Sequence, residues 1–264
     1  MTATAAVAGV FAERAARARE LAGRYAYASE PLRLAGALFE AQASAFERAQ
    51  ADRPSPDELV PYIVRVGLPA VMEATMAEGT EVLREAALLA FHDGDLDGIV
   101  AAWLGGGDLR PTDRYLARAA SAPILEALPN AASTMRHGES DDRHCPVCGG
   151  PPQLAIHTDT GESLVTGERR LQCSRCMTEW RFARLTCASC GDTGGANTPI
   201  LSDPQRLPHV RVDACDRCRR YLLTIEMPKE PRAVAVVDEI VGLPLDLIAA
   251  ERGYTKIAPN VMGF

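Results

Sequence analysis

Four pairs of cysteines are the residues whose types and spacing could do chemistry in this chain. Each pair has the form C-x-x-C, and no cysteine of the 264 residues lies outside them: Cys145/Cys148, Cys173/Cys176, Cys187/Cys190 and Cys215/Cys218. Such a loop can form a disulfide, act as a redox pair or supply two thiolates to a metal ion. A thioredoxin-type motif has one reactive pair in a βαβ unit, and disulfides belong to secreted chains. Four equivalent pairs in a chain without a recognisable secretion signal therefore favour metal binding.

The pairs follow an internal repeat. Every cysteine of the first two pairs has a counterpart 42 residues further along, so that C-x2-C-x24-C-x2-C occurs twice. Such regular self-similarity indicates a duplicated unit. In each unit two tight loops would face each other around one tetrahedral ion, as in a rubredoxin-like or zinc-ribbon module.

The repeat predicts two metal ions per chain, each in a closed four-thiolate site. The ligands of the first are expected to be Cys145, Cys148, Cys173 and Cys176, and those of the second Cys187, Cys190, Cys215 and Cys218. Four thiolates suit zinc or iron. A second grouping stays open, in which the two middle pairs form one site as C-x2-C-x10-C-x2-C and the outer pairs form the other.

The residues around the cysteines support the ribbon interpretation. Glycine follows the first pair, where a tight loop requires a positive φ. A β-like run follows each unit, "TEWRFARLT" and "RRYLLTIEM", and a polar, turn-rich segment is expected between the pairs of a unit. We expect Trp180, Phe182, Tyr221 and Leu223 to shield the sites. His144 and His157 lie close enough to compete as ligands, but with four thiolates already available they are better explained as surface or supporting residues. His209 has no distinctive signal.

The elements that must position these sites fall on both sides of the cysteine region. Residues 1–138 contain no cysteine and have apolar residues at helical spacing, for example Leu34, Leu38, Ala41 and Ala45. Thr80 and Thr112 are predicted to cap two of the helices. Residues 129–144 are polar and small, and we expect a linker there.

The predicted fold class is therefore α+β, in four units. A helical domain would span residues 1–138, a first metal ribbon 139–186, a second metal ribbon 187–228, and a C-terminal helical segment that packs back on the others 229–264. The helical part is a scaffold, since it holds no catalytic constellation.

Charge and composition restrict the classes of function. The net charge is −7, and residues 139–228 hold 11 Arg against 12 Asp and Glu, so a nucleic-acid surface is poorly supported. No uninterrupted run of 18 apolar residues occurs, which predicts a protein that does not insert into a membrane. The sequence also has no phosphate loop, HExxH string or nucleophile elbow, so we expect no enzyme activity.

Three strings resemble one known family: "HCPVCGGPP", "LQCSRCMTEWRFARLTCASCG" and "ACDRCRRYLLTI". Together with "PLRLAGALFEAQ" near the amino terminus and "LPLDLIAAERGY" near the carboxy terminus, they are similar to the formate dehydrogenase accessory proteins of the FdhE family. The C-x-x-C-x-T-E-W string that leads into the third pair is the most specific part. The resemblance extends over nearly the whole chain.

The resemblance implies a cytoplasmic, non-enzymatic protein that helps to mature a molybdenum- or tungsten-containing formate dehydrogenase by contacting its catalytic subunit. It implies that all eight cysteines are metal ligands, and it favours iron over zinc. Two alternatives belong to other classes: a nucleic-acid-binding zinc-ribbon protein, and an Fe(Cys)4 electron carrier that acts during enzyme maturation. The same ligands serve structural zinc and redox-active iron, so the sequence leaves this choice open.

Overall fold

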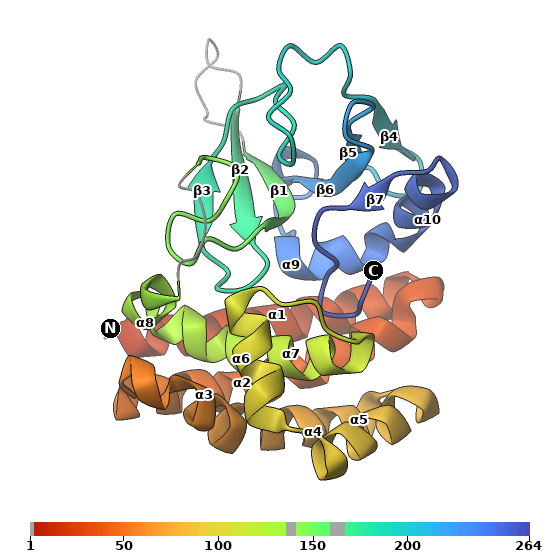
Figure 1. The fold of residues 1–264 in the computed structure, drawn as a ribbon. Helices are drawn as coiled ribbons and strands as arrows, with labels where there is room; N and C mark the ends of the chain where they lie inside the picture. The colour runs from red at the N-terminus through yellow and green to blue at the C-terminus, as the bar shows by residue number, and fades with distance from the viewer. Residues whose placement is uncertain (1–2, 136–140, 159–166) are drawn as a thin grey trace.

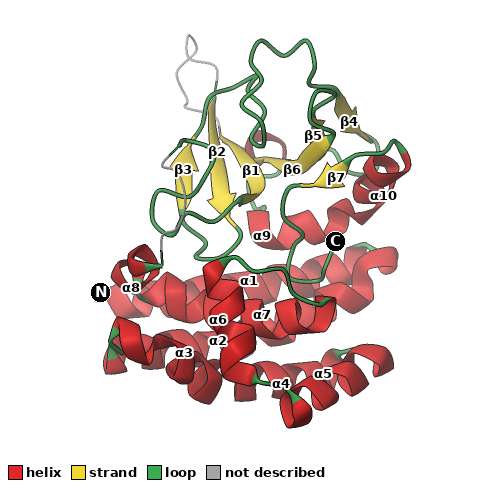
Figure 2. Ribbon diagram, viewed as in Figure 1, coloured by secondary structure: helices red, strands yellow, loops and turns green. Residues whose placement is uncertain are grey.

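A helical layer and a sheet region lie one on the other in the computed structural model of the chain (Figure 1). The structure describes residues 3–135, 141–158 and 167–264. The amino-terminal half of the chain forms the helical layer, and the carboxy-terminal half forms the sheet and two further short helices, as the colouring by secondary structure shows (Figure 2). The predicted α+β fold class is confirmed.

The helical layer contains eight α-helices within residues 3–135. Their bounds are α1 Ala3–Arg24, α2 Ser29–Asp52, α3 Leu59–Tyr62, α4 Leu68–Glu78, α5 Glu81–Asp93, α6 Leu96–Gly105, α7 Pro111–Ala127 and α8 Pro129–Thr134. Short 3-10 turns at Ala26–Ala28 and Pro56–Glu58 and a π-helical stretch at Ile63–Gly67 connect some of them. Thr80 caps α5 as predicted, because its hydroxyl accepts a hydrogen bond from the amide of Leu83.

Helix α2 lies in the middle of the layer and is buried on two faces. Leu34 and Leu38 lie on the face predicted from their spacing, and they pack into the core beneath α4 and α7. Leu32 and Phe39 lie on a second face, which packs against α1 and joins another core. A helix that packs between two neighbouring elements needs apolar residues on both sides. The single apolar face predicted from the sequence therefore accounts for only half of the packing of α2.

The sheet region is one sheet made of two similar halves. Its strands are β1 Pro152–Thr158, β2 Glu168–Cys173, β3 Glu179–Arg181, β4 Ile200–Ser202, β5 Val210–Ala214, β6 Arg220–Glu226 and β7 Thr255–Lys256. The order is β3-β2-β1-β6-β5-β4, with β7 beside β6. Each half is thus an antiparallel group of three, and the halves join where β1 runs parallel to β6, with Leu154 opposite Leu223.

Two core clusters hold the sheet to the helices. The first contains Leu38, Ile63 and Leu116 from the helices together with Leu171 of β2. The second contains Phe11 of α1, Val212 of β5 and Leu223 of β6, together with the helical segment that follows the sheet. That segment consists of α9 Ala235–Asp238, a 3-10 turn Glu239–Gly242 and α10 Leu243–Glu251, and α9 lies between the sheet and α1 (Figure 1).

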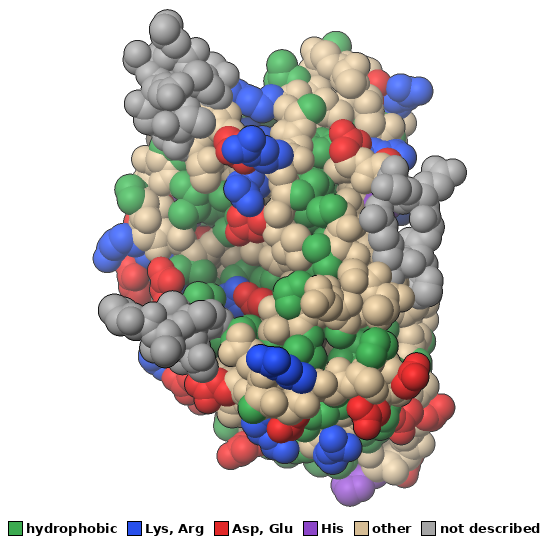
Figure 3. Space-filling model, turned by 90° about the vertical axis from the view of Figure 1, so that its left-hand side faces the viewer, with side chains coloured by type: hydrophobic (Ala, Val, Ile, Leu, Met, Phe, Trp, Pro, Cys, Tyr) green, Lys and Arg blue, Asp and Glu red, His purple; other side chains and the backbone are tan. Residues whose placement is uncertain are grey.

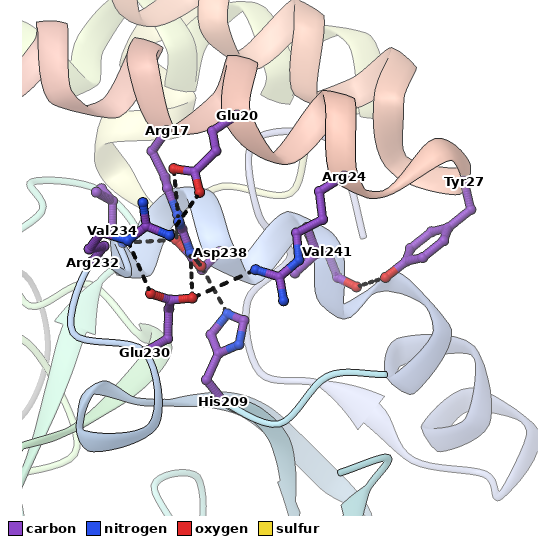
Figure 4. Close-up of polar contacts among 10 residues, drawn as sticks. All are labelled: Arg17, Glu20, Arg24, Tyr27, His209, Glu230, Arg232, Val234, Asp238 and Val241. Atoms are coloured by element: carbon purple, nitrogen blue, oxygen red, sulfur yellow. Dashed lines mark hydrogen bonds and ion pairs between the residues drawn. The ribbon is translucent and has the colours of Figure 1, made fainter. Parts of the chain in front are cut away.

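A buried ion pair fastens α1 to the carboxy-terminal segment. Arg17 of α1 donates two hydrogen bonds to Asp238 of α9, at 3.0 and 2.6 Å, and Nε2 of His209 lies 2.9 Å from the same carboxylate (Figure 4). The amide of Val234 also donates to it. Burial alone would raise the pKa of Asp238, but the hydrogen bonds from His209 and Arg17 hold this pKa below its ordinary value. Glu230 contributes a longer ion pair to Arg17, at 3.8 Å.

Three local predictions are wrong. Thr112 does not cap α7; Arg110 is the N-cap residue and Pro111 begins the helix, because proline suits a first turn that needs no amide donor. Helix α8 occupies the first part of the stretch predicted as a linker, 129–144, and residues 136–140 of that stretch lie outside the described residues. The segment between the first two cysteine pairs is not merely polar and turn-rich, since it contains β1 and most of β2.

One helical run passes a length and composition test for a membrane span among the residues described. It is Pro56–Glu78, of 23 residues, with a mean hydropathy of 1.3. Buried core helices pass the same test, and 56% of its apolar window is buried inside the protein. This run is therefore weak evidence for a span.

Candidate metal centres

All four C-x-x-C loops share one backbone geometry. In each loop the amide of the first cysteine donates to the carbonyl five residues later, as from Cys145 to Gly150 at 2.9 Å and from Cys215 to Arg220 at 2.9 Å. The residue after the second cysteine has a positive φ in every loop; these residues are Gly149 at 72°, Met177 at 61°, Gly191 at 75° and Arg219 at 58°. A left-handed residue reverses the chain within so few residues that the loop's own amides turn toward the sulfur atoms.

The folded chain gathers the cysteines into two clusters. Cys145, Cys148, Cys173 and Cys176 form the first cluster, and Cys187, Cys190, Cys215 and Cys218 form the second, with the sulfur atoms of each cluster within 4.8 Å of one another. The first loop faces the second across the β1–β2 hairpin, and the third faces the fourth. This is the grouping within each repeat unit, and the two middle pairs do not come together.

The sulfur spacing fits a tetrahedral ion. In the first cluster Cys145 lies 3.5 Å from Cys176, and Cys148 lies 3.4 Å from Cys173. The corresponding distances in the second cluster are 3.7 and 3.8 Å. A tetrahedron with metal–sulfur bonds of about 2.3 Å has edges of about 3.8 Å. A disulfide needs about 2.05 Å, and all eight thiols are free.

The thiols of one cluster cannot all keep ordinary proton affinities. Hydrogen bonds with Cys148, Cys173 and Cys176 lower the pKa of Cys145 far below its ordinary value, whereas burial and the same close contacts raise the pKa of Cys173. In the second cluster burial raises the pKa of Cys187 to about 12. Four crowded sulfur atoms are fully ionised only when a cation replaces their protons, so the arrangement suits a thiophilic metal ion.

The two clusters differ in their access to solvent. The first is enclosed: its cysteines are 0 to 3% exposed, and all four belong to the core cluster that includes the helices. In the second, Cys187 and Cys215 are buried but Cys190 and Cys218 are only half-buried. None of these four belongs to either core cluster of the described residues.

A comparison of equivalent positions shows how tightly each cluster is packed. Gly150 lies two residues after Cys148, and a side chain there would place its Cβ 2.9 Å from the sulfur of Cys173. The residue 42 positions later is Asp192, whose side chain forms an ion pair of 2.9 Å with the exposed Arg217. The first cluster therefore leaves no room for a side chain at Gly150, whereas the second cluster has room for the side chain of Asp192 at the equivalent position.

The other residues predicted around the sites are only partly where we expected them. Trp180 and Phe182 are buried in the same core cluster as the first set of cysteines. Tyr221 and Leu223 belong to the other core cluster, where the Tyr221 hydroxyl donates to Asp246 of α10 at 2.9 Å, and this core cluster contains none of the second set of cysteines. The side chain of His144 contacts Asp141 at 2.7 Å.

His209 has a structural role that its sequence context did not reveal. It is 1% exposed and belongs to the contact between Asp238 and Arg17 (Figure 4). These residues are separated by up to 221 positions in the chain. No local pattern predicts such a contact, because Arg17 lies in α1, Asp238 in α9 and His209 in the turn before β5.

The fold and the two clusters define a class: a helical protein that carries a pair of four-cysteine ribbons in one sheet. Two family models match the part of the chain that carries these clusters. The model described as FdhE, central domain, matches residues 144–184, and the model described as FdhE, C-terminal domain, matches residues 185–262. The FdhE resemblance predicted from the sequence is thereby confirmed, since residues 144–262 match both of these FdhE domain models.

Curated relatives agree with this assignment. The chain is 27% identical over 188 residues to the FdhE homologue of Aquifex aeolicus, and 30% identical over 209 residues to that of Pseudomonas aeruginosa. The matches cover 70% and 74% of this chain and 65% and 63% of those relatives. FdhE of Escherichia coli is 32% identical over 139 residues, which cover 53% of this chain and 43% of that protein. The chain thus matches less than two thirds of the length of these relatives.

A solved structure shows the same fold. The crystal structure of FdhE from Pseudomonas aeruginosa superposes with a TM-score of 0.71 and covers 97% of this chain and 95% of its own. The sequence identity in that superposition is 24%, so the likeness concerns the fold alone.

Proposed function

We propose that this protein is a non-enzymatic assembly factor for formate dehydrogenase, which acts in the cytoplasm and binds the catalytic subunit of that enzyme. The observation that carries the proposal is the match of residues 144–262 to both FdhE domains. The resemblance to the FdhE family links this chain to formate dehydrogenase maturation. The arrangement of the sites supports a role without catalysis, as follows.

The eight cysteines are proposed to hold two metal ions, with iron favoured by the family resemblance and zinc equally suited to the ligands. Four thiolates complete a tetrahedral shell, so an ion bound there has no open position for a substrate or a catalytic water. The ion would instead hold the paired loops together, and in small metal ribbons the binding free energy is folding free energy. The residues of this chain therefore supply a rigid surface rather than a reactive centre.

The surface supports a protein partner better than a nucleic acid. The net charge is −7. On the face seen in Figure 3, basic and acidic side chains are interspersed with one another. A hollow lies between the upper and lower parts of the molecule on this face. Nucleic-acid binding depends on a basic surface that neutralises phosphates.

The decisive test is deletion of the gene, followed by measurement of formate dehydrogenase activity and subunit abundance. We expect the deletion strain to have low formate dehydrogenase activity, whether its catalytic subunit is still present or has been degraded. Reintroduction of the intact gene should restore this activity. A tagged copy should co-purify the immature catalytic subunit in preference to the finished enzyme, because equal binding to both forms could not promote maturation. Normal active enzyme in the deletion strain, with no co-purification in the parent, would contradict the proposal.

The half-exposed thiols of the second cluster favour one alternative, an electron carrier with iron in that site. Anaerobically purified protein would then show a visible thiolate-to-iron band that a mild reductant bleaches reversibly. Full activity of a zinc-only protein in the complementation assay would rule this alternative out.

A further inference from the structure

We propose that the two clusters have different metal chemistry: the second exchanges a thiophilic ion with ligands in solution, whereas the first retains its ion. This inference rests on the proposed metal binding and extends it by giving each cluster its own role. The exchange site is formed by Cys190 and Cys218, the second cysteines of the third and fourth loops.

The argument begins with equivalent cysteines. Cys148 and Cys190 occupy the same place in the two units, as do Cys176 and Cys218, and the loop backbones are alike. Cys148 is 0% exposed and Cys176 is 3% exposed, while their counterparts are half-buried. The two sites present the same donor atoms, so the difference between them is access.

What covers each site explains the difference in access. Over the first cluster lie the buried Trp180, whose indole N–H donates to the carbonyl of Asp142 at 2.7 Å, and the core side chains of the helical layer. Beside the second cluster lies the ion pair of Asp192 and Arg217, in which the Arg217 side chain is 66% exposed. Solvent and small solutes reach exposed thiolates directly, whereas buried ones become reachable only through local unfolding.

The exchange itself is a ligand substitution. A chelator or thiolate in solution would form a bond to an ion held by the second cluster as the bond from that ion to Cys190 or Cys218 breaks, and the released thiolate would take a proton from water. The ion keeps its charge and no electron moves. Repetition at the remaining sulfur atoms transfers the ion to the incoming ligand.

The test uses the full chain loaded with two equivalents of zinc and mixed with an excess of a chelating dye. We expect one equivalent to be released at least about tenfold faster than the other, because only one site avoids an unfolding step. In parallel, brief treatment with iodoacetamide and peptide mass spectrometry should find Cys190 and Cys218 modified before the cysteines of the first cluster.

A matched variant assigns the fast phase. Cys190→Ser should remove the fast equivalent and leave the slow equivalent unchanged, and Asp192→Ala should accelerate only the fast phase. A single release rate for both ions, or early modification of Cys148 and Cys176, would overturn the inference while leaving metal binding intact. Uptake of fewer than two equivalents would instead contradict the metal sites of the proposed function, and this inference with them.

Discussion

The first and second cysteine clusters have the same spacing and the same loops, yet one is part of the protein core and the other is at its surface. In the first, a Cβ at Gly150 would approach the sulfur of Cys173 to 2.9 Å, and the helical layer packs against the cysteines. At the equivalent position of the second cluster Asp192 reaches the exposed Arg217. A duplicated motif therefore reproduces its cysteines but not their surroundings.

The reason lies in where each half of the sheet meets the helices. The first half supplies its cysteines to the same apolar cluster as α2, α4 and α7. The second half is held instead by its strands, which pack against α1 and α9, and by the ion pair of Arg17 and Asp238. Its four cysteines belong to neither core cluster of the described residues. The first cluster is thus coupled to the core, whereas the second is not part of it.

The largest difference is expected between Cys148→Ser and Cys190→Ser. Metal binding contributes about 10 kcal/mol or more in small zinc domains, which is comparable with the whole stability of a domain. Loss of the buried ligand Cys148 should therefore abolish the cooperative unfolding transition of the whole chain. Cys190→Ser should destabilise the second half and leave a folded helical signal.

The unfolding of the two variants can be compared by denaturant titration followed by far-UV circular dichroism, together with metal analysis of each variant. Limited proteolysis should cut the Cys190→Ser protein first within residues 187–228. Equal loss of helical signal in the two variants would show that both clusters are coupled to the core to the same extent.

Asp238→Asn tests the contact that holds the second half to α1. Removing one partner of a buried pair leaves the other charge uncompensated, which typically costs about 3–5 kcal/mol. Arg17 is 3% exposed and would lose its main carboxylate. The matched control is Glu40→Gln, in an exposed pair with Arg19 that should contribute less than about 1 kcal/mol. Urea titrations of the three proteins give the comparison, and a cost below that of the control would refute the assignment.

The same pair predicts a dependence on pH. The pKa of Asp238 is lower in the folded protein than its ordinary value, so its contribution is fully present above the unfolded pKa of about 3.9 and is lost as the pH falls through the folded pKa. The stability difference between wild type and Asp238→Asn should therefore shrink below about pH 4. A difference that stays constant to pH 2.5 would contradict this role.

Gly150→Ala should have an intermediate effect. The added Cβ would overlap the sulfur of Cys173, and overpacking of this kind costs about 1–3 kcal/mol. Affinity for zinc at the first cluster should fall, while the second cluster is unaffected. Asp192→Ala at the equivalent position is the control, and its first cluster should bind zinc as tightly as that of the parent. Equal zinc affinities for Gly150→Ala and the parent, measured by competition with a chelating dye, would show that the first loop is less tightly packed than the structure indicates.

The smallest effect is expected for Arg217→Ala. The Arg217 side chain is 66% exposed, and exposed ion pairs contribute little to stability because water and salt screen them. The thermal unfolding midpoint should not change measurably, in contrast to that of Cys148→Ser, Asp238→Asn and Gly150→Ala. A clear drop would indicate that the second cluster relies on this pair more than on its metal ion.

The amino-acid sequence was sufficient to predict the helical first half, the four loops and the family resemblance. These features follow from short-range patterns: apolar spacing along one helix, and two cysteines in a turn that needs a positive φ after Cys148. The regular repeat of 42 residues also predicted that Cys145 and Cys173 would lie in one cluster. That either cluster binds a metal ion stays a prediction.

Tertiary structure alone decided the surroundings of the two clusters. The parallel pairing of β1 with β6 and the contact of His209 with Asp238 join segments far apart in the chain, and such packing leaves Cys148 buried but Cys190 only half-buried. A single sequence carries no local signal for such contacts, because they depend on which faces of the helices and strands remain to be covered once each element has formed. The two halves have the same loops, and only the packing of the helical layer makes one buried and the other accessible.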